Sequence, residues 1–229
     1  MRRASTIQGH LAADGYEIVS GVLAPEELDD VLRAAGDFPR SRAGMRHLMG
    51  FDSVAKIAND RRMIGLASGA IGEGATPFRA TLFDKSSDAN WLVVWHQDTA
   101  LPLKSRHDEA GWGPWSLKDG VHYAHAPAWA LEEVVALRLH LDDSSSENGP
   151  LRVIAGTHRS GLLTDYEVEE LATKCEAIEC TVSKGGIIIM RPLLLHASSK
   201  SKSSAPRRIL HVEYASAKLP DLGVQLAIA

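Results

Sequence analysis

The chain has 229 residues, of which 45% are hydrophobic and 24% charged. This is an ordinary composition for a globular domain, and it excludes a collagen-like or globally disordered chain. The net charge of −4 provides no basic field for nucleic acid or an anionic membrane, and no apolar run of about 18 residues is present. We therefore expect a single-domain cytoplasmic protein that acts on a small molecule; the sequence does not predict its oligomeric state.

The amino-terminal part, about residues 1–75, is expected to be largely helical. Residues 15–20 have the composition of a short strand. A helix is predicted over residues 25–35, because proline at the first helical position and acidic side chains in the first turn both favour a helix start. A second helix is predicted over residues 60–68, with Gly69 closing it.

From residue 78 onward the pattern becomes that of β-structure. Short runs rich in Val, Ile, Leu and Trp alternate with turn residues, at positions 78–83, 90–96, 134–141, 151–155, 186–190 and 209–215. The pattern predicts an antiparallel barrel or jelly roll with its core over about residues 78–216. The cluster at residues 142–149 ends in Asn-Gly and predicts a hairpin.

A long segment, about residues 99–131, interrupts these strands. It contains three of the five tryptophans, and a loop of this length is typically a lid or a binding loop. We expect a lid insertion that packs, with Trp112 and Trp129 as candidate substrate contacts. The segment also holds three histidines that are interpreted either as polar lid residues or as a second metal site: His107, His122 and His125.

A candidate metal site comes from two separate strand ends. His96 and Asp98 lie two residues apart where an apolar strand ends, so their side chains share a face and can bind one ion. His196 ends another apolar run and offers a third ligand. Two histidines and one carboxylate leave adjacent coordination positions of iron(II) open. His96, Asp98 and His196 are therefore the predicted metal ligands and catalytic residues.

A second His-x-Asp triplet, His140 and Asp142, competes with the first. It directly precedes the turn cluster, so a strand histidine followed by a solvated or turn-capping aspartate is the simpler interpretation. Arg138 and His140 remain candidates for substrate contact. Arg207 and Arg208 alternate on a later strand, so one is expected to face inward, where a guanidinium can bind a carboxylate through two hydrogen bonds.

Several segments, in order, resemble the phytanoyl-CoA dioxygenase-like (PhyH) family of iron(II)- and 2-oxoglutarate-dependent oxygenases. They occupy residues 79–85, 90–98, 137–143, 147–158, 196–198 and 206–208, and the resemblance spans about residues 15–216. It implies a mainly β fold with flanking helices, the double-stranded β-helix, and iron held by the three predicted ligands. It also implies that Arg207 binds 2-oxoglutarate, with Ser198, Lys85 and Asn90 as further candidates for the cosubstrate pocket.

The activity implied by the resemblance is hydroxylation of a C–H bond of a small molecule. The reaction consumes O2 and 2-oxoglutarate and releases succinate and carbon dioxide. Asp98 argues against halogenation, because halogenating relatives carry a small residue there. Two alternatives stay open: a cupin-like metalloenzyme, such as an isomerase or a cosubstrate-independent dioxygenase, and a non-catalytic ligand-binding β-barrel. The residues do not specify the substrate, nor whether it is linked to coenzyme A.

Overall fold

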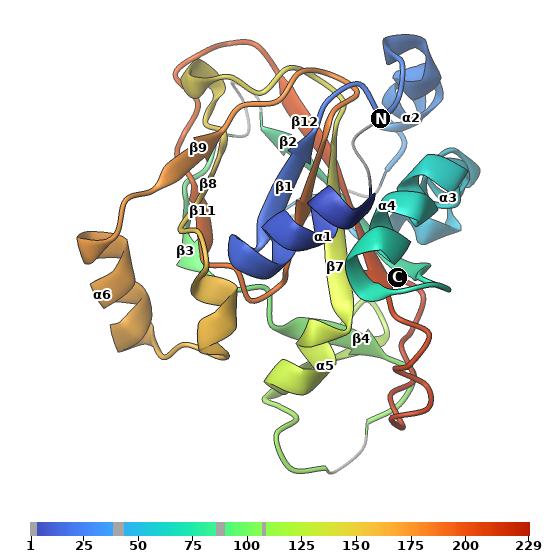
Figure 1. Cartoon of the computed structure of the whole chain (residues 1–229). Helices are drawn as coiled ribbons and strands as arrows, with labels where there is room; N and C mark the ends of the chain where they lie inside the picture. The colour runs from blue at the N-terminus through green and yellow to red at the C-terminus, as the bar shows by residue number, and fades with distance from the viewer. Residues whose placement is uncertain (1–3, 39–43, 86–89, 107–108) are drawn as a thin grey trace.

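The computed structural model describes residues 4–38, 44–85, 90–106 and 109–229 (Figure 1). Within these ranges the α-helices are α1 (Ala4–Ala13), α2 (Asp29–Ala34), α3 (Asp52–Ala58), α4 (Arg61–Ile71), α5 (Ala128–Glu132) and α6 (Asp165–Lys174). The strands are β1 (Tyr16–Val19), β2 (Thr76–Lys85), β3 (Val93–His96), β4 (Ala100–Leu103), β5 (Trp115–Lys118), β6 (Val121–His125), β7 (Val134–His140), β8 (Leu151–Val153), β9 (Ile178–Cys180), β10 (Ile187–Met190), β11 (His196–Ser198) and β12 (Arg207–Ala215). No helix in the described part of the chain is long and apolar enough to cross a membrane.

Two antiparallel sheets form a double-stranded β-helix. As far as the chain is described, the larger sheet has the strand order β1-β10-β7-β12-β2 and the smaller one β3-β11-β8-β9. The chain passes from one sheet to the other between β7 and β8 and again between β10 and β11, since β7 pairs with β10 and β8 pairs with β11. The predicted fold class, a mainly β jelly roll with flanking helices, is confirmed.

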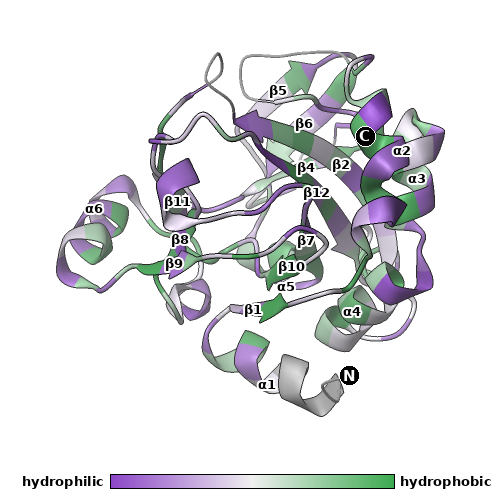
Figure 2. Ribbon diagram, turned by 90° about the horizontal axis from the view of Figure 1, so that it is seen from above, coloured by the Kyte–Doolittle hydropathy of each residue, from purple (hydrophilic) through white to green (hydrophobic). Residues whose placement is uncertain are grey.

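The larger sheet has one apolar face and one face that carries polar groups. Leu137 and Leu139 of β7 belong to a core cluster that includes Val31 of α2, Val54 of α3 and Met63 of α4. Figure 2 shows these three helices together beside β2 and β12. Because side chains alternate along a strand, the residues between these leucines point to the opposite face, toward the smaller sheet. The interior between the sheets is therefore available for chemistry.

Helix α4 continues past the glycine that was predicted to end it. Asp60 caps its amino terminus by accepting a hydrogen bond from the backbone N–H of Arg62 at 2.8 Å. A Cβ atom at Gly69 would meet nothing within 4 Å, so the helix passes through this position on its exposed side. The helix ends instead at Gly72, which has a φ of 96° that favours glycine. The predicted end at Gly69 is wrong by three residues.

The predicted hairpin at the Asn-Gly turn is also wrong, because the strands on either side, β7 and β8, belong to different sheets. The Asn148 side chain donates to the Asp143 carbonyl at 2.7 Å and accepts from the Ser145 N–H at 2.9 Å, which closes the turn locally. Gly149 has a φ of 66°, and a Cβ atom there would lie 2.3 Å from the carbonyl oxygen of Ser199. The turn therefore marks a crossing between sheets and a close backbone approach.

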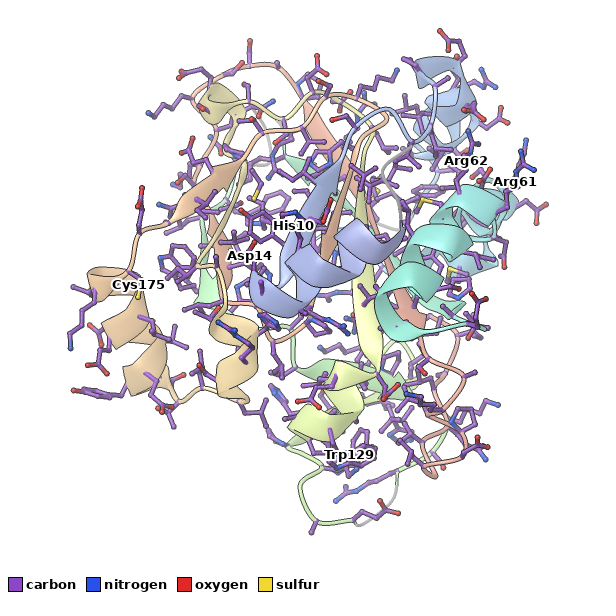
Figure 3. The ribbon with its side chains drawn as sticks, viewed as in Figure 1. His10, Asp14, Arg61, Arg62, Trp129 and Cys175 are labelled. Carbon is purple, nitrogen blue, oxygen red and sulfur yellow. The ribbon has the colours of Figure 1, made fainter. Side chains whose placement is uncertain are left out.

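Residues 99–131, the predicted lid insertion, form a small third sheet with the order β4-β6-β5, followed by α5. Apolar residues of the segment, among them Leu101 and Trp112, pack in one cluster with Leu219 from the carboxyl-terminal part. Trp129, labelled on α5 in Figure 3, lies edge-on to Trp112 with ring centroids 6.2 Å apart. The segment thus packs in an apolar cluster that it shares with other parts of the chain, and its role as a lid stays a prediction.

Candidate metal centre

The structure brings His96, Asp98 and His196 together. Antiparallel pairing of β3 with β11 places His196 directly opposite His96, with ring centroids 4.2 Å apart. The Asp98 carboxylate lies 3.7 Å from Nε2 of His96 and 3.5 Å from Nε2 of His196. The three potential ligand atoms lie within 4.8 Å of one another, and no other such group occurs among the described residues.

Both imidazoles are held in the same tautomer by the backbone. Nδ1 of His96 donates to the carbonyl of Val94, and Nδ1 of His196 donates to the carbonyl of Leu194, each at 2.8 Å. The acceptor is a carbonyl, so Nδ1 must carry the proton and Nε2 keeps its lone pair. A hydrogen bond of this kind orients a metal-binding histidine. The two free lone pairs therefore face the Asp98 carboxylate.

Electrostatics place Asp98 and His196 in the protonation states that a metal ion needs. Burial alone would raise the pKa of Asp98, but His196 and His96 hold it well below its usual range. Burial lowers the pKa of His196 to about 4, against the opposing effect of Asp98. At neutral pH Asp98 is thus ionised and His196 neutral. These are the forms of a carboxylate and an imidazole that bind metals.

Gln97, between His96 at the end of β3 and Asp98 just beyond it, ties this strand end to the rest of the protein. Its side-chain amide donates to the carbonyls of Leu193 and Gly161, at 2.7 and 2.8 Å, and accepts from the N–H of Leu163 at 2.9 Å. The backbone N–H of Asp98 donates to the carbonyl of Pro192 at 2.9 Å. The segment that carries His96 and Asp98 is therefore hydrogen-bonded to the segment that precedes His196. The sequence analysis did not indicate this role for Gln97.

Two buried cations lie at one end of the site. Arg207 faces Lys85 across the β12–β2 pair, and both are at most 4% exposed. Nζ of Lys85 donates to Oγ of Ser198 at 2.8 Å and to the carbonyl of Ser199 at 2.6 Å. Nε of Arg207 donates to the carbonyl of Asn148 at 3.1 Å, whereas its buried Nη1 has no hydrogen-bond partner. An unpartnered buried guanidinium nitrogen is a binding position for an anion.

Burial and mutual repulsion lower the pKa of both cations, Lys85 and Arg207. Burial, with contributions from Arg207 and Arg138, lowers the pKa of Lys85 to about 7. Burial and Arg138 lower the pKa of Arg207 to about 10. No carboxylate is hydrogen-bonded to either group in the described part of the structure. A bound carboxylate would relieve this repulsion.

The predicted ligands and the two cations open into one cavity of about 580 Å³. Its wall also includes Ser198 and Arg138, whose Nη1 donates to Nδ1 of His211 at 3.0 Å. His140 does not line the cavity; it is fully buried, and its Nδ1 donates to the Arg138 carbonyl at 3.1 Å. Of the two polar residues predicted on β7 for substrate contact, the structure thus exposes only Arg138 to the cavity.

Other predicted site residues lie outside the cavity wall. The side chain of Asn90 is occupied by the backbone of Ser201, donating to its carbonyl at 2.8 Å and accepting from its N–H at 2.7 Å. Trp112 packs in the apolar cluster of residues 99–131, and Trp129, which is 42% exposed, lies edge-on to it. Neither tryptophan lines the cavity, so their substrate contacts stay a prediction without support from the cavity wall, and Asn90 has a structural partner.

The rival triplet and the remaining histidines do not form a second centre in the described chain. Asp142 is neither solvated nor turn-capping, since its carboxylate accepts from Nε and Nη2 of Arg208 at 2.8 and 2.7 Å. His125 lines the cavity, and its Nδ1 lies 2.7 Å from Oγ1 of Thr99. His122 does not line it, and His107 lies outside the described residues.

Some cavity residues escaped the sequence analysis. Arg79, Thr81 and Phe83 follow the same alternation on β2 as Lys85, so that strand pattern contained the signal for them. His211 follows the alternation of β12 from Arg207 in the same way. No local pattern marked three others, which reach the cavity through tertiary contacts: Arg46, Lys118 and Tyr123.

A double-stranded β-helix with two histidines and a carboxylate at one strand pair defines a class of metal-dependent oxygenase folds. Comparison with known proteins agrees. The model of the phytanoyl-CoA dioxygenase (PhyH) family matches residues 11–209, and the chain belongs to this family. This confirms the family indicated by the sequence motifs.

Individual relatives are more distant. L-proline trans-4-hydroxylase of Streptomyces griseoviridis is 26% identical over 138 residues, which is 49% of this chain and 51% of the hydroxylase. AviO1 of Streptomyces viridochromogenes Tue57 has a TM-score of 0.67 at 20% identity, covering 95% of this chain and 96% of AviO1. EctD of S. alaskensis, crystallised with 2-oxoglutarate and 5-hydroxyectoine, has a TM-score of 0.71 at 19% identity, covering 93% of this chain and 76% of EctD. These solved structures support the fold.

Proposed function

We propose that this protein is an iron(II)- and 2-oxoglutarate-dependent dioxygenase that hydroxylates a C–H bond of a small molecule and releases succinate and carbon dioxide. The observation that carries the proposal is one cavity lined both by the His96, Asp98 and His196 cluster and by buried Arg207, whose Nη1 has no hydrogen-bond partner. Membership of the PhyH family and the 2-oxoglutarate bound in the EctD relative support it.

The residues present fit the iron. Both imidazoles donate from Nδ1 to a carbonyl and so present Nε2, and one ionised carboxylate faces both, so the donor set of two histidines and a carboxylate suits a ferrous ion. His96, Asp98 and His196 would hold it. When bound, iron together with 2-oxoglutarate and O2 supplies the oxidising power for C–H hydroxylation.

The residues also fit the cosubstrate. Arg207 and Lys85 would bind the carboxylate of 2-oxoglutarate that lies farther from the metal, and Ser198 holds Lys85 in place by accepting from its Nζ. The segment of residues 99–131 places Thr99, Lys118 and Tyr123 on the cavity wall, so it contributes to excluding water from the reacting groups.

Two measurements test this function. Anaerobic titration should show that iron(II) binds and that 2-oxoglutarate then adds a visible charge-transfer absorption. His96→Ala should abolish the absorption by losing the metal, and Arg207→Gln should weaken 2-oxoglutarate binding while keeping the metal. Succinate release that survives in Arg207→Gln, or iron affinity that survives in His96→Ala, would contradict the assignment. A metal that binds without any 2-oxoglutarate dependence would favour the cupin-like alternative.

A further inference from the structure

The end of the cavity beside the 99–131 segment is strongly cationic. Arg46, Arg79 and Lys118 all contribute to the wall there. Arg79 is neutralised, because its guanidinium pairs with buried Glu213 and donates to the carbonyl of Ala100 at 2.8 Å. Arg46 and Lys118 have no such partner: no carboxylate pairs with either within the described ranges of the chain. Two half-buried positive charges therefore face the cavity uncompensated.

Tertiary pairing brings Arg46 to this position. A backbone bridge sets Met45 opposite Leu82 of β2, and both side chains enter the apolar cluster under the helices. Because side chains alternate along extended backbone, Arg46 turns to the other face, where Thr81 of β2 also lines the cavity. The position of Arg46 is thus fixed by the burial of its neighbour.

Lys118 comes from the opposite side, at the end of β5. Its Nζ lies 4.7 Å from the ring centre of Tyr123, which positions the ammonium by a cation–π contact. The Tyr123 hydroxyl lies 3.0 Å from Nε2 of His47, the residue after Arg46. Burial lowers the pKa of Lys118, and Arg46 and Arg79 lower it further, as expected for like charges held close together. The contact between Tyr123 and His47 joins the two chain segments that carry the free cations.

This cationic pair is distinct from the one formed by Lys85 and Arg207. Thr81 and Lys85 are four residues apart on β2, so their backbones are separated by roughly 13 Å at the rise of an extended strand. A five-carbon dicarboxylate is too short to neutralise both ends of the cavity. With 2-oxoglutarate at the Arg207 end, the Arg46 end stays available to a second anion.

We propose that the substrate carries an anionic group, a carboxylate or a phosphate, that Arg46 and Lys118 bind at the end of the cavity opposite Arg207. The proposal rests on the oxygenase function above and narrows its substrate class to small organic anions. Charge-assisted hydrogen bonds to a guanidinium and an ammonium make such a site selective, since a neutral analogue would leave two half-buried cations without an anionic partner. The metal cluster lines the same cavity, so a molecule anchored there lies within reach of the reacting centre.

The test uses the protein loaded with zinc(II) and 2-oxoglutarate. Zinc(II) has no redox chemistry, so the loaded protein can bind ligands without turnover. Inorganic phosphate and two matched pairs, L-proline with L-prolinamide and benzoate with benzamide, are titrated by calorimetry. At least one of the two acids or phosphate should bind, and the amide of a binding acid, which lacks the carboxylate, should bind far more weakly. The double variant Arg46→Gln, Lys118→Gln should weaken anion binding by about ten- to a hundredfold, the loss expected for charge-assisted hydrogen bonds. Preference for an acid or for phosphate identifies the group.

Two controls separate this inference from the proposed function. Lys104→Gln removes an exposed cation of the same segment outside the cavity wall, and it should bind the anions like the wild type. Affinity for 2-oxoglutarate should be unchanged in the double variant. Equal binding of acid and amide, anion affinity that survives the double substitution, or no anion binding in protein that binds 2-oxoglutarate would each overturn the proposal. Failure to bind 2-oxoglutarate at all would instead overturn the oxygenase function.

Discussion

Replacing Arg207 by methionine should stabilise the ligand-free protein and weaken its binding of 2-oxoglutarate. Arg207 is 4% exposed, and burial together with Arg138 lowers its pKa from 12.5 to about 10. A lowered pKa on a base means that the fold disfavours the charged form. The guanidinium therefore costs stability at every pH below about 10, by about 3 kcal/mol.

Methionine has a similar length and no charge, so it removes this cost but also the hydrogen bond from Nε to the Asn148 carbonyl, worth about 1 kcal/mol. The net gain is up to about 2 kcal/mol, or a rise in Tm of about 4–8 °C. In the complex, two charge-assisted hydrogen bonds are lost, worth about 3–6 kcal/mol together, so 2-oxoglutarate should bind about 10²- to 10⁴-fold more weakly.

Calorimetry measures both effects. Thermal unfolding of the metal-free protein gives the change in stability, and anaerobic titration of the zinc-loaded protein gives the change in affinity for 2-oxoglutarate. Arg208→Met is the matched control on the adjacent residue. It breaks the ion pair with Asp142, so it should lower stability by about 1 kcal/mol and leave 2-oxoglutarate affinity unchanged. If Arg207→Met instead unfolds at a lower temperature than the wild type and binds 2-oxoglutarate normally, the buried charge is not the cosubstrate anchor.

Four further outcomes are expected. Asp98→Ala should lose the metal on dialysis, as read by elemental analysis, because the two imidazoles alone lack a compensating charge. Lys85 is charged below its pKa of about 7, and a bound carboxylate favours the charged form. The affinity of the wild type for 2-oxoglutarate should therefore fall as the pH rises through neutrality. In Lys85→Arg the affinity should stay constant, because an arginine keeps its charge over this range. Tyr214→Phe removes a fully buried hydroxyl that donates to the carbonyl of Ala58 at 2.8 Å, and it should lower the free energy of unfolding by about 1–2 kcal/mol in urea titrations. Gly149→Ala would push the Ser199 carbonyl away from Lys85, so it should reduce both Tm and the affinity for 2-oxoglutarate. Gly50→Ala is the control, because a Cβ atom at residue 50 meets no other atom within 4 Å, and it should leave the affinity for 2-oxoglutarate unaltered.

Most strands of the two main sheets were predictable because their burial follows a local pattern; the short strands β9 and β11 were not predicted. β7 and β10 are buried along their whole length; β10 appears in the sequence as a continuous apolar run, and β7 as an apolar run interrupted only by Arg138 and His140. Helix α6 was missed for the converse reason. It has no buried residue, hence no apolar stripe, although Thr164 and Glu167 form a capping box at its start that a search for helix ends would have found.

The metal cluster was predictable in its members but not in its geometry. His96 and Asp98 are near neighbours at a strand end, whereas the placement of His196 opposite His96 depends on the pairing of β3 with β11, about a hundred residues apart. Arg46 is the extreme case. Its direction is decided by the burial of Met45 against Leu82, a contact that no feature of the local sequence announces.

Strand β3, which carries one of the paired histidines, is an edge strand with β11 as its single neighbour in the described sheet, whereas β7 lies in the middle of the larger sheet. Edge strands open at a lower free energy than central ones, so the backbone at residues 93–96 should exchange its amide protons long before that of β7. Fraying there separates His96 from His196 without disturbing the central strands. Loss of the metal ion and unfolding of the protein would then be two separate events. A protein that has lost the ion in this way could bind it again without refolding.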